Sequence, residues 1–123
     1  MKITAEIEPV PLARTQINTF NRGRFLTARS QQFKRDLGII AGAAMHGQKI
    51  FTGALSLKIN LYKNCAITSR RYGDADNHAK AILDACNGII FLDDAQVVSL
   101  QVVKHKSATQ KVVIEIDEYE ISD

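Results

Sequence analysis

Apolar and polar residues alternate in four segments of the chain, which predicts four β-strands. The first segment covers residues 3–7 and ends where Pro9 and Pro11 follow. The second runs from Leu55 to Tyr62 and has the most regular alternation. The last two cover residues 98–102 and 112–116, and HKSATQ, at 105–110, is the predicted hairpin loop between them.

Two further segments carry apolar residues at the spacing of a helix. Ser30 is the predicted N-cap of the first helix and Gly47 its predicted end. Gly38 and Gly42 lower the helical propensity inside it, so we expect close packing against the sheet there. The second helix is predicted from about residue 74 to Gly88. The two apolar faces consist of Phe33, Leu37, Ile40, Ala41 and Ala44, and of Ala79, Ile82, Leu83 and Cys86.

A basic loop, ARTQINTFNRGRFLTARS, separates the first strand from the first helix. In it Gly23 lies between Arg22 and Arg24, and the apolar pair Phe25 and Leu26 follows, which predicts a small hairpin. The predicted order of elements is therefore β-(ββ)-α-β-α-β-β. This order is typical of an α+β fold with two helices packed on a mainly antiparallel or mixed sheet.

The composition predicts one intracellular domain. With 123 residues, of which 46% are hydrophobic, the chain has the size of a single domain, assigned to residues 1–123. Cys65 and Cys86 are too few for a disulfide framework and are predicted to be reduced. No signal peptide is visible, and no apolar run approaches the roughly 18 residues of a membrane span. We therefore expect a cytoplasmic protein without a membrane partner.

The net charge of +3 hides a strong asymmetry along the chain. Residues 1–71 contain 12 basic and 3 acidic residues, a balance of +9, whereas residues 72–123 contain 4 basic and 10 acidic residues, a balance of −6. Such a division fits a basic surface that faces a polyanion, with an acidic cluster close by, and it equally fits charges that only solvate the surface. Charge alone does not decide between the two.

The acidic residues of the second half occur at the start of the predicted second helix and again after it. Asp74 and Asp76 begin the helix, whereas Asp93 and Asp94 follow the apolar segment IIFL. The helix from Asp76 to residue 87 advances about 17 Å, and an extended chain from residue 88 to Asp94 spans about 20 Å. If IIFL returns along the helix, Asp94 reaches Asp74 and Asp76, and we expect three carboxylates to converge.

Carboxylates held together in this way favour a divalent cation with oxygen ligands, Mg²⁺ or Mn²⁺. Such an ion suits phosphodiester hydrolysis, and Lys80, four residues from both Asp76 and Asp84, can direct its ammonium group at the phosphate or the attacking water. Taken singly, these residues also fit helix capping and ion pairing. His46, His78 and His105 lack the spacing of metal ligands and are predicted to be surface or capping residues. Cys86 is predicted to pack in the core.

The stretch GDADNHAKAILDACNGIIFLDDAQVVSLQVVKH closely resembles the RusA family of Holliday junction resolvases. The family signature is D-x-D-N-x-x-K at a helix start, an Asp later in that helix, and a D-D-x-Q-V turn. The resemblance is strong over residues 74–104 and looser over the N-terminal part. Family members often carry two nearby arginines after the first proline turn, whereas this chain has Arg14 and then Gln16.

The resemblance implies a small homodimeric, Mg²⁺-dependent endodeoxyribonuclease, commonly prophage-encoded, that resolves four-way DNA junctions in recombination and repair. It assigns Asp74, Asp76 and Asp94 as metal-binding catalytic acids and Lys80 as the catalytic lysine. Two symmetric nicks require two sites, which agrees with a dimer. Two alternatives remain: a branched-DNA nuclease that acts on flaps or forks, and a junction-binding protein without catalysis. The expected phosphate contacts come from Arg70 and Arg71, which adjoin the acids, and from Arg14, Arg22, Arg24, Arg29, Lys34 and Arg35.

Overall fold

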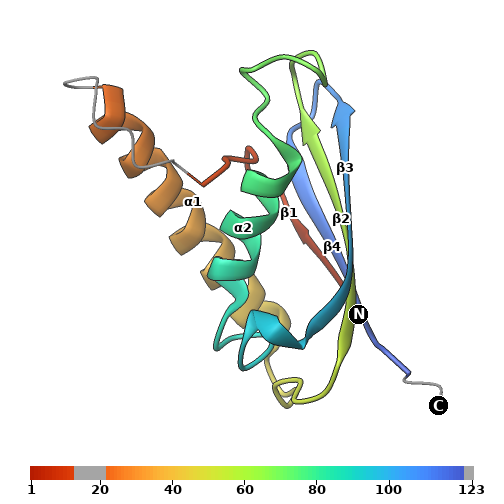
Figure 1. Cartoon of the computed structure of the whole chain (residues 1–123). Coiled ribbons are helices and arrows are strands. Elements are labelled where there is room, and N and C mark those ends of the chain that lie inside the picture. Colours follow the sequence, from red (N-terminus) through yellow and green to blue (C-terminus); the bar gives the residue numbers. More distant parts are fainter. Residues whose placement is uncertain (13–21, 121–123) are drawn as a thin grey trace.

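The chain folds as a four-stranded sheet with both helices on one face, as a computed structural model shows (Figure 1). The structure describes the backbone of residues 1–12 and 22–120 and the side chains of residues 1–12 and 28–120. The strands are β1 (Lys2–Ala5), β2 (Leu55–Lys63), β3 (Val97–Lys106) and β4 (Lys111–Glu118); the helices are α1 (Arg22–Ala44), α2 (Ala75–Cys86) and the short 3-10 helix η1 (Asp94–Gln96). The predicted α+β class is confirmed.

The sheet has the strand order β1-β4-β2-β3. β4 pairs antiparallel with both β1 and β2, whereas β3 pairs parallel with β2, so the sheet is mixed. The predicted hairpin between the last two strands is wrong because β2 lies between them. The loop after β3 instead passes over the end of β2, where the Ser107 amide donates to the Lys63 carbonyl oxygen at 3.0 Å.

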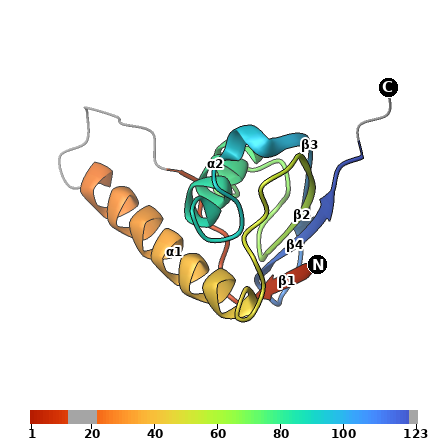
Figure 2. The ribbon, with the colours of Figure 1, turned by 90° about the horizontal axis from the view of Figure 1, so that it is seen from below.

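The core lies between the sheet and the helices, which cover the same face in both views (Figure 2). β2 and β4 are central strands, and the side chains that they direct toward the helices are buried. This burial explains the regular alternation seen in β2, because only one face of the sheet is covered. The fully buried apolar side chains of the two strands, each at most 1% exposed, are Leu55, Leu57, Ile59, Leu61, Val112, Ile114 and Ile116.

Helix α1 differs most from its prediction. It begins at Arg22, so the predicted hairpin around Gly23 is absent and Ser30 lies inside the helix, 3% exposed, instead of capping it. The segment from Arg22 to Ser30 contains no proline and is rich in good helix formers, which allows the helix to extend toward the N-terminus. Residues 13–21, including Arg14, lie outside the described residues.

The two glycines inside α1 also differ from their prediction. A Cβ atom at Gly38 would lie 3.5 Å from Ile89 Cδ1 and 3.7 Å from the Ala85 carbonyl oxygen, so the close approach is to α2 and the turn after it, and not to the sheet. At Gly42 a Cβ atom would meet nothing within 4 Å. The helix packs on α2 and β1, and its buried apolar side chains are Phe33, Leu37 and Ala41.

Candidate active site at the two ends of α2

The first part of the candidate site is the N-terminal end of α2. Gly73 adopts a positive φ of 94°, and Asp74 follows in an extended conformation as the N-cap residue of the helix. The Asp74 side chain makes no capping hydrogen bond, so capping does not account for an aspartate here. Asp76 lies in the first turn, where the helix dipole favours a carboxylate, and both acidic side chains are exposed.

The exposed face of α2 carries Asp76, Lys80 and Asp84 at intervals of four residues. Each interval advances the helix by about 6 Å, so Lys80 lies between the two carboxylates along the axis. In the described part of the chain no ion pair joins Lys80 to either aspartate. No contact among the described residues therefore supports the interpretation of Lys80 as an ion-pair partner of Asp76 or Asp84.

The segment after α2 forms a tight turn instead of returning along the helix. The Gly88 amide donates to the Phe91 carbonyl oxygen at 2.7 Å, and the Phe51 amide donates to the Ile90 carbonyl oxygen at 2.9 Å. Ile90 and Phe91 are fully buried at this end of the core. The expected extended path is therefore wrong, because burying these two side chains holds the chain near the C-terminal end of α2.

As a result Asp94, the first residue of η1, lies near Asp84 in the C-terminal half of α2, whereas Asp74 is the N-cap residue at the other end of that helix. A side-chain hydrogen bond with Asp93 raises the pKa of the exposed Asp94 carboxyl, and the neighbouring carboxylates of Asp93 and Asp84 act in the same direction. Among the described residues no group of three His, Cys, Asp or Glu side chains is arranged to hold a metal ion. The predicted convergence of Asp74, Asp76 and Asp94 does not occur within one subunit.

Gln96 fixes the turn that carries Asp93 and Asp94. Its Oε1 accepts hydrogen bonds from the Leu92 and Asp93 amides at 2.8 and 3.0 Å. Its Nε2 donates to the carbonyl oxygens of Phe51 and Gly53 at 2.9 and 3.0 Å. The Gln96 amide group therefore uses both its oxygen and its nitrogen to join the acidic turn to the segment before β2. The sequence signature D-D-x-Q-V gave no reason to expect these hydrogen bonds.

The three histidines have different environments. His46 is exposed, as predicted, whereas His105 is half-buried and stacks on Tyr62 with ring centroids 4.6 Å apart. His78 is fully buried, so its prediction as a surface or capping residue is wrong. Burial lowers the pKa of His78 to about 4, and the imidazole is therefore neutral near pH 7. Its position four residues before Ile82, on the apolar face of α2, was the available signal.

The basic candidates fall into three groups. Arg70 and Arg71 are exposed in the turn just before Asp74 and therefore adjoin the acids, as predicted. Arg29 makes an ion pair with Glu8 at 2.9 Å. The side chains of Arg14, Arg22 and Arg24 lie outside the described residues, although the backbone of the last two forms the start of α1.

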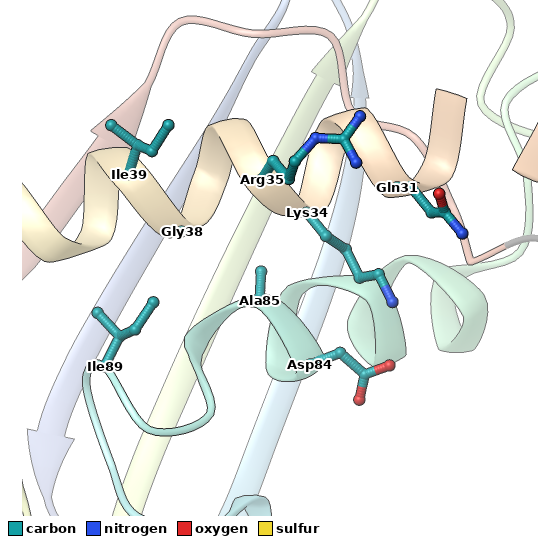
Figure 3. Close-up of a pocket in the computed structure, with 8 residues that line it drawn as sticks. All are labelled: Gln31, Lys34, Arg35, Gly38, Ile39, Asp84, Ala85 and Ile89. Atoms are coloured by element: carbon teal, nitrogen blue, oxygen red, sulfur yellow. The ribbon is translucent and has the colours of Figure 1, made fainter. Parts of the chain in front are cut away.

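A groove of about 630 Å³ separates α1 from α2 (Figure 3). Lys34 and Arg35 line its α1 side, and Asp84 lines its α2 side. Ile39, which is 72% exposed, also lines it. The groove is therefore lined by apolar and charged side chains together. It lies beside α2, the helix that carries the acidic residues.

Comparison with known proteins assigns the chain to a family of nucleases. The family model described as endodeoxyribonuclease RusA matches residues 6–117. The crossover junction endodeoxyribonucleases RusA of Escherichia coli strain K12 and of Enterobacteria phage 82 are both 34% identical to the chain, over 78% of its length and 78% of theirs. The protein YqaN of Bacillus subtilis strain 168 is 28% identical, over 96% of both chains.

These matches confirm the enzyme class predicted from the sequence, a DNA endonuclease. The chain belongs to the RusA family of endodeoxyribonucleases. Within residues 1–12 and 22–120, no helix is both long enough and apolar enough to span a membrane.

Proposed function

We propose that this protein is a divalent-metal-dependent endonuclease that resolves four-way DNA junctions by paired symmetric nicks. The observation that carries the proposal is the family match over residues 6–117, a range that includes every proposed catalytic residue. The RusA proteins of Escherichia coli strain K12 and of Enterobacteria phage 82, both 34% identical to the chain, bear the name crossover junction endodeoxyribonuclease. We further propose action in the bacterial cytoplasm during recombination and repair, and a prophage origin.

The proposed metal ligands are Asp74, Asp76 and Asp94, whose exposed carboxylates are the hard oxygen donors that Mg²⁺ or Mn²⁺ prefers. A bound ion would neutralise phosphate charge and lower the pKa of a water molecule. Lys80 contributes an exposed ammonium group one turn beyond Asp76, where it stabilises the charge that develops on the phosphate. Arg70 and Arg71 bind the flanking DNA phosphates.

A homodimer formed through β3 explains how the three acids meet although one subunit holds them apart. β3 is an edge strand of ten residues, and the registered pairs Leu57–Leu100 and Ile59–Val102 direct its Leu100 and Val102 toward the helix side of the sheet. Val98 and Leu100 are nevertheless 55% and 43% exposed. An unpaired edge with exposed apolar side chains favours pairing with another strand.

Antiparallel pairing of β3 with its twofold copy also brings the acids together. Asp94 precedes β3 at one end, and at the other end Lys104 Nζ contacts the Gly73 carbonyl oxygen beside Asp74 at 3.1 Å. Reversing the partner strand places Asp94 of the partner subunit at the end where Asp74 and Asp76 lie. The dimer therefore supplies two complete sites, one for each of two symmetric nicks.

The direct test measures nicking of a synthetic four-way junction with Mg²⁺ or with EDTA. Asp74→Asn, Asp76→Asn and Asp94→Asn should each abolish Mg²⁺-dependent nicking, because each removes a metal ligand, while junction binding in EDTA survives. Wild-type nicking by any of the three variants contradicts its assignment. A protein that binds the junction but never cuts it is a binding protein, and faster cutting of flaps or forks identifies a different branched substrate.

Mixed dimers test whether the sites form between subunits. When Asp74→Asn and Asp94→Asn subunits are combined, a site shared between subunits leaves one of the two sites with all its acids, so nicking of one strand returns. If each site lies within one subunit, both remain defective and no nicking returns. A mixture of Asp74→Asn and Asp76→Asn subunits is the matched control. Both substitutions lie at the N-terminal end of α2, so every site lacks one acid whether or not the sites are shared between subunits.

A further inference from the structure

Three consecutive backbone carbonyl groups in the turn before α2 accept hydrogen bonds from three side chains. Lys63 Nζ donates to the Arg71 carbonyl oxygen at 3.4 Å, and His78 Nε2 lies 2.6 Å from that of Tyr72. Lys104 Nζ donates to the carbonyl oxygen of Gly73 at 3.1 Å. The donors come from β2, α2 and β3, so three different elements each contribute one contact.

These donors are buried to an extent that is unusual for their residue types. Lys63 is 6% exposed and His78 is fully buried, and Lys104 is half-buried. The Nδ1 atom of His78 is buried without a hydrogen-bond partner. The burial of the Lys63 ammonium group is compensated by Glu8 Oε1 at 3.8 Å and by hydrogen bonds to the carbonyl oxygens of Pro9 at 3.2 Å and Arg71 at 3.4 Å. The unpaired ring nitrogen of His78 is a cost that an apolar residue would avoid.

The turn is packed on its remaining sides as well. A Cβ atom at Gly73 would lie 2.8 Å from Pro11 Cγ and 3.1 Å from His78 Nε2, so only glycine fits. The Tyr72 hydroxyl lies between β2 and β3, within hydrogen-bond distance of the carbonyl oxygens of Leu61 at 2.9 Å and His105 at 2.8 Å, and it accepts a hydrogen bond from the His105 amide at 3.2 Å. The backbone from Tyr72 to Asp74 is therefore fixed from inside, whereas the Asp74 side chain faces solvent.

We propose that Lys63, His78 and Lys104 are positioning residues that hold the backbone of residues 71–73, and thereby fix where Asp74 presents its carboxylate to the metal ion. This inference rests on the proposed metal site. None of the three side chains needs to touch DNA or metal, because each acts through a carbonyl group of the three residues that precede Asp74. Lys104 is the most direct of them, since the carbonyl it holds belongs to the peptide bond that joins Gly73 to Asp74.

Variants of Lys104 separate the hydrogen bond from the charge. Lys104→Met removes both the donor and the charge at similar length, whereas Lys104→Gln keeps a donor and removes the charge. His78→Leu and His78→Gln make the same comparison at the Tyr72 carbonyl. Lys58→Met, on the exposed side of β2, is the matched control because it removes a lysine that makes no contact with the turn.

Three measurements are needed: Mn²⁺ affinity, amide hydrogen exchange over residues 70–76, and Mg²⁺-dependent nicking. We expect Lys104→Met to weaken Mn²⁺ binding about tenfold, as is typical when a group that orients a ligand is lost. Exchange should accelerate over residues 70–76 while the amides of β2 and β4 stay protected. Lys104→Gln should recover most of the affinity, and Lys58→Met should behave like the wild type.

Unchanged Mn²⁺ affinity or unchanged exchange in Lys104→Met overturns the positioning role, even if the wild type nicks junctions normally. A Lys104→Gln variant as poor as Lys104→Met also overturns it, because the charge and not the hydrogen bond would then matter. Conversely, a wild type that does not nick but binds Mn²⁺ in a Lys104-dependent way keeps the positioning role and rejects the nuclease proposal.

Discussion

Individual residues in α2 show what residue type and spacing can reveal. Asp76, Lys80 and Asp84 could be assigned to one helix face from the sequence, because residues four positions apart lie on the same face of a helix. The burial of His78 could also have been read from its place on the apolar face, yet its hydrogen bond to the Tyr72 carbonyl could not. That contact depends on the path of the preceding turn, which Gly73 and Pro11 determine together.

The exposed ammonium group of Lys80 should act on the chemical step. Lys80→Met should lower the single-turnover rate of junction nicking at saturating Mg²⁺ by about 10²-fold or more, since one electrostatic donor is lost at the phosphate. Junction affinity in EDTA should hardly change. Rapid-quench measurements at saturating enzyme provide the rate. A variant with weaker binding and an unchanged rate would show that Lys80 only binds DNA.

Cys86 is fully buried as predicted, and it should make stability sensitive to alkaline pH. Burial raises the pKa of its thiol from 9.0 to about 12, so between these values the unfolded chain loses a proton that the folded chain keeps. Stability is therefore fully present below pH 9 and falls as the pH rises, by about 1 kcal/mol near pH 10. Urea unfolding in reductant should show this extra loss in the wild type and not in Cys86→Ala; equal losses would contradict it.

At the scale of elements, the helices and strands with a regular apolar pattern could be predicted from the sequence. Elements whose ends or paths depend on packing against distant residues could not. β2 and α2 were found because one face of each is buried. The early start of α1 was missed because Ser30 imitates an N-cap although it lies inside the helix. The turn after α2 was missed because the apolar sequence IIFL does not show where its side chains are buried. Ile90 and Phe91 are in fact buried close to the C-terminal end of α2.

Gln96 should be important for the stability of the acidic turn. Gln96→Glu keeps the shape of the side chain but cannot donate to the Phe51 and Gly53 carbonyl groups, and it places a further negative charge beside Asp93. We expect a loss of about 2 kcal/mol in the free energy of unfolding, measured with urea near pH 7. Gln110→Glu, which keeps the acceptor for the Asn64 amide, is the control and should be nearly neutral. Equal stability of both variants would contradict the role of Gln96.

At the scale of the whole molecule, the asymmetric charge of the sequence did not by itself distinguish a surface that binds a polyanion from ordinary solvated charges, and the family match supplies the DNA endonuclease class. The predicted meeting of all three acids within one chain failed because the burial of Ile90 and Phe91 holds the segment before Asp94 near the C-terminal end of α2. The edge position of β3 cannot be read from its sequence, since Val98 and Leu100 alternate like residues of a covered strand. Only the pairing order shows that this strand lies at the margin of the sheet.

The proposed dimer predicts different effects of two similar substitutions. Leu100→Lys places a charge in the β3 interface and should weaken dimerisation by about 2 kcal/mol or more, as expected at the centre of an interface. Ile39→Lys places the same charge on an exposed residue of the groove between α1 and α2 and should leave the dimer intact. Sedimentation equilibrium measures both. If only Ile39→Lys abolished the dimer, the interface would lie in the groove between α1 and α2, and the proposed β3 interface would be wrong.

The place of β4 in the sheet has a consequence for how the protein is made. β4 lies between β1 and β2, and the pairs Lys2–Glu115 and Ala5–Val112 join β1 to β4 although more than a hundred residues separate them in the sequence. During synthesis the sheet cannot be completed until residues 111–118 have left the ribosome, because β4, one of its two central strands, is translated after the other three. A premature stop codon that removes only β4 would therefore leave β1 without a neighbour and the core open, even though every proposed catalytic residue had already been translated.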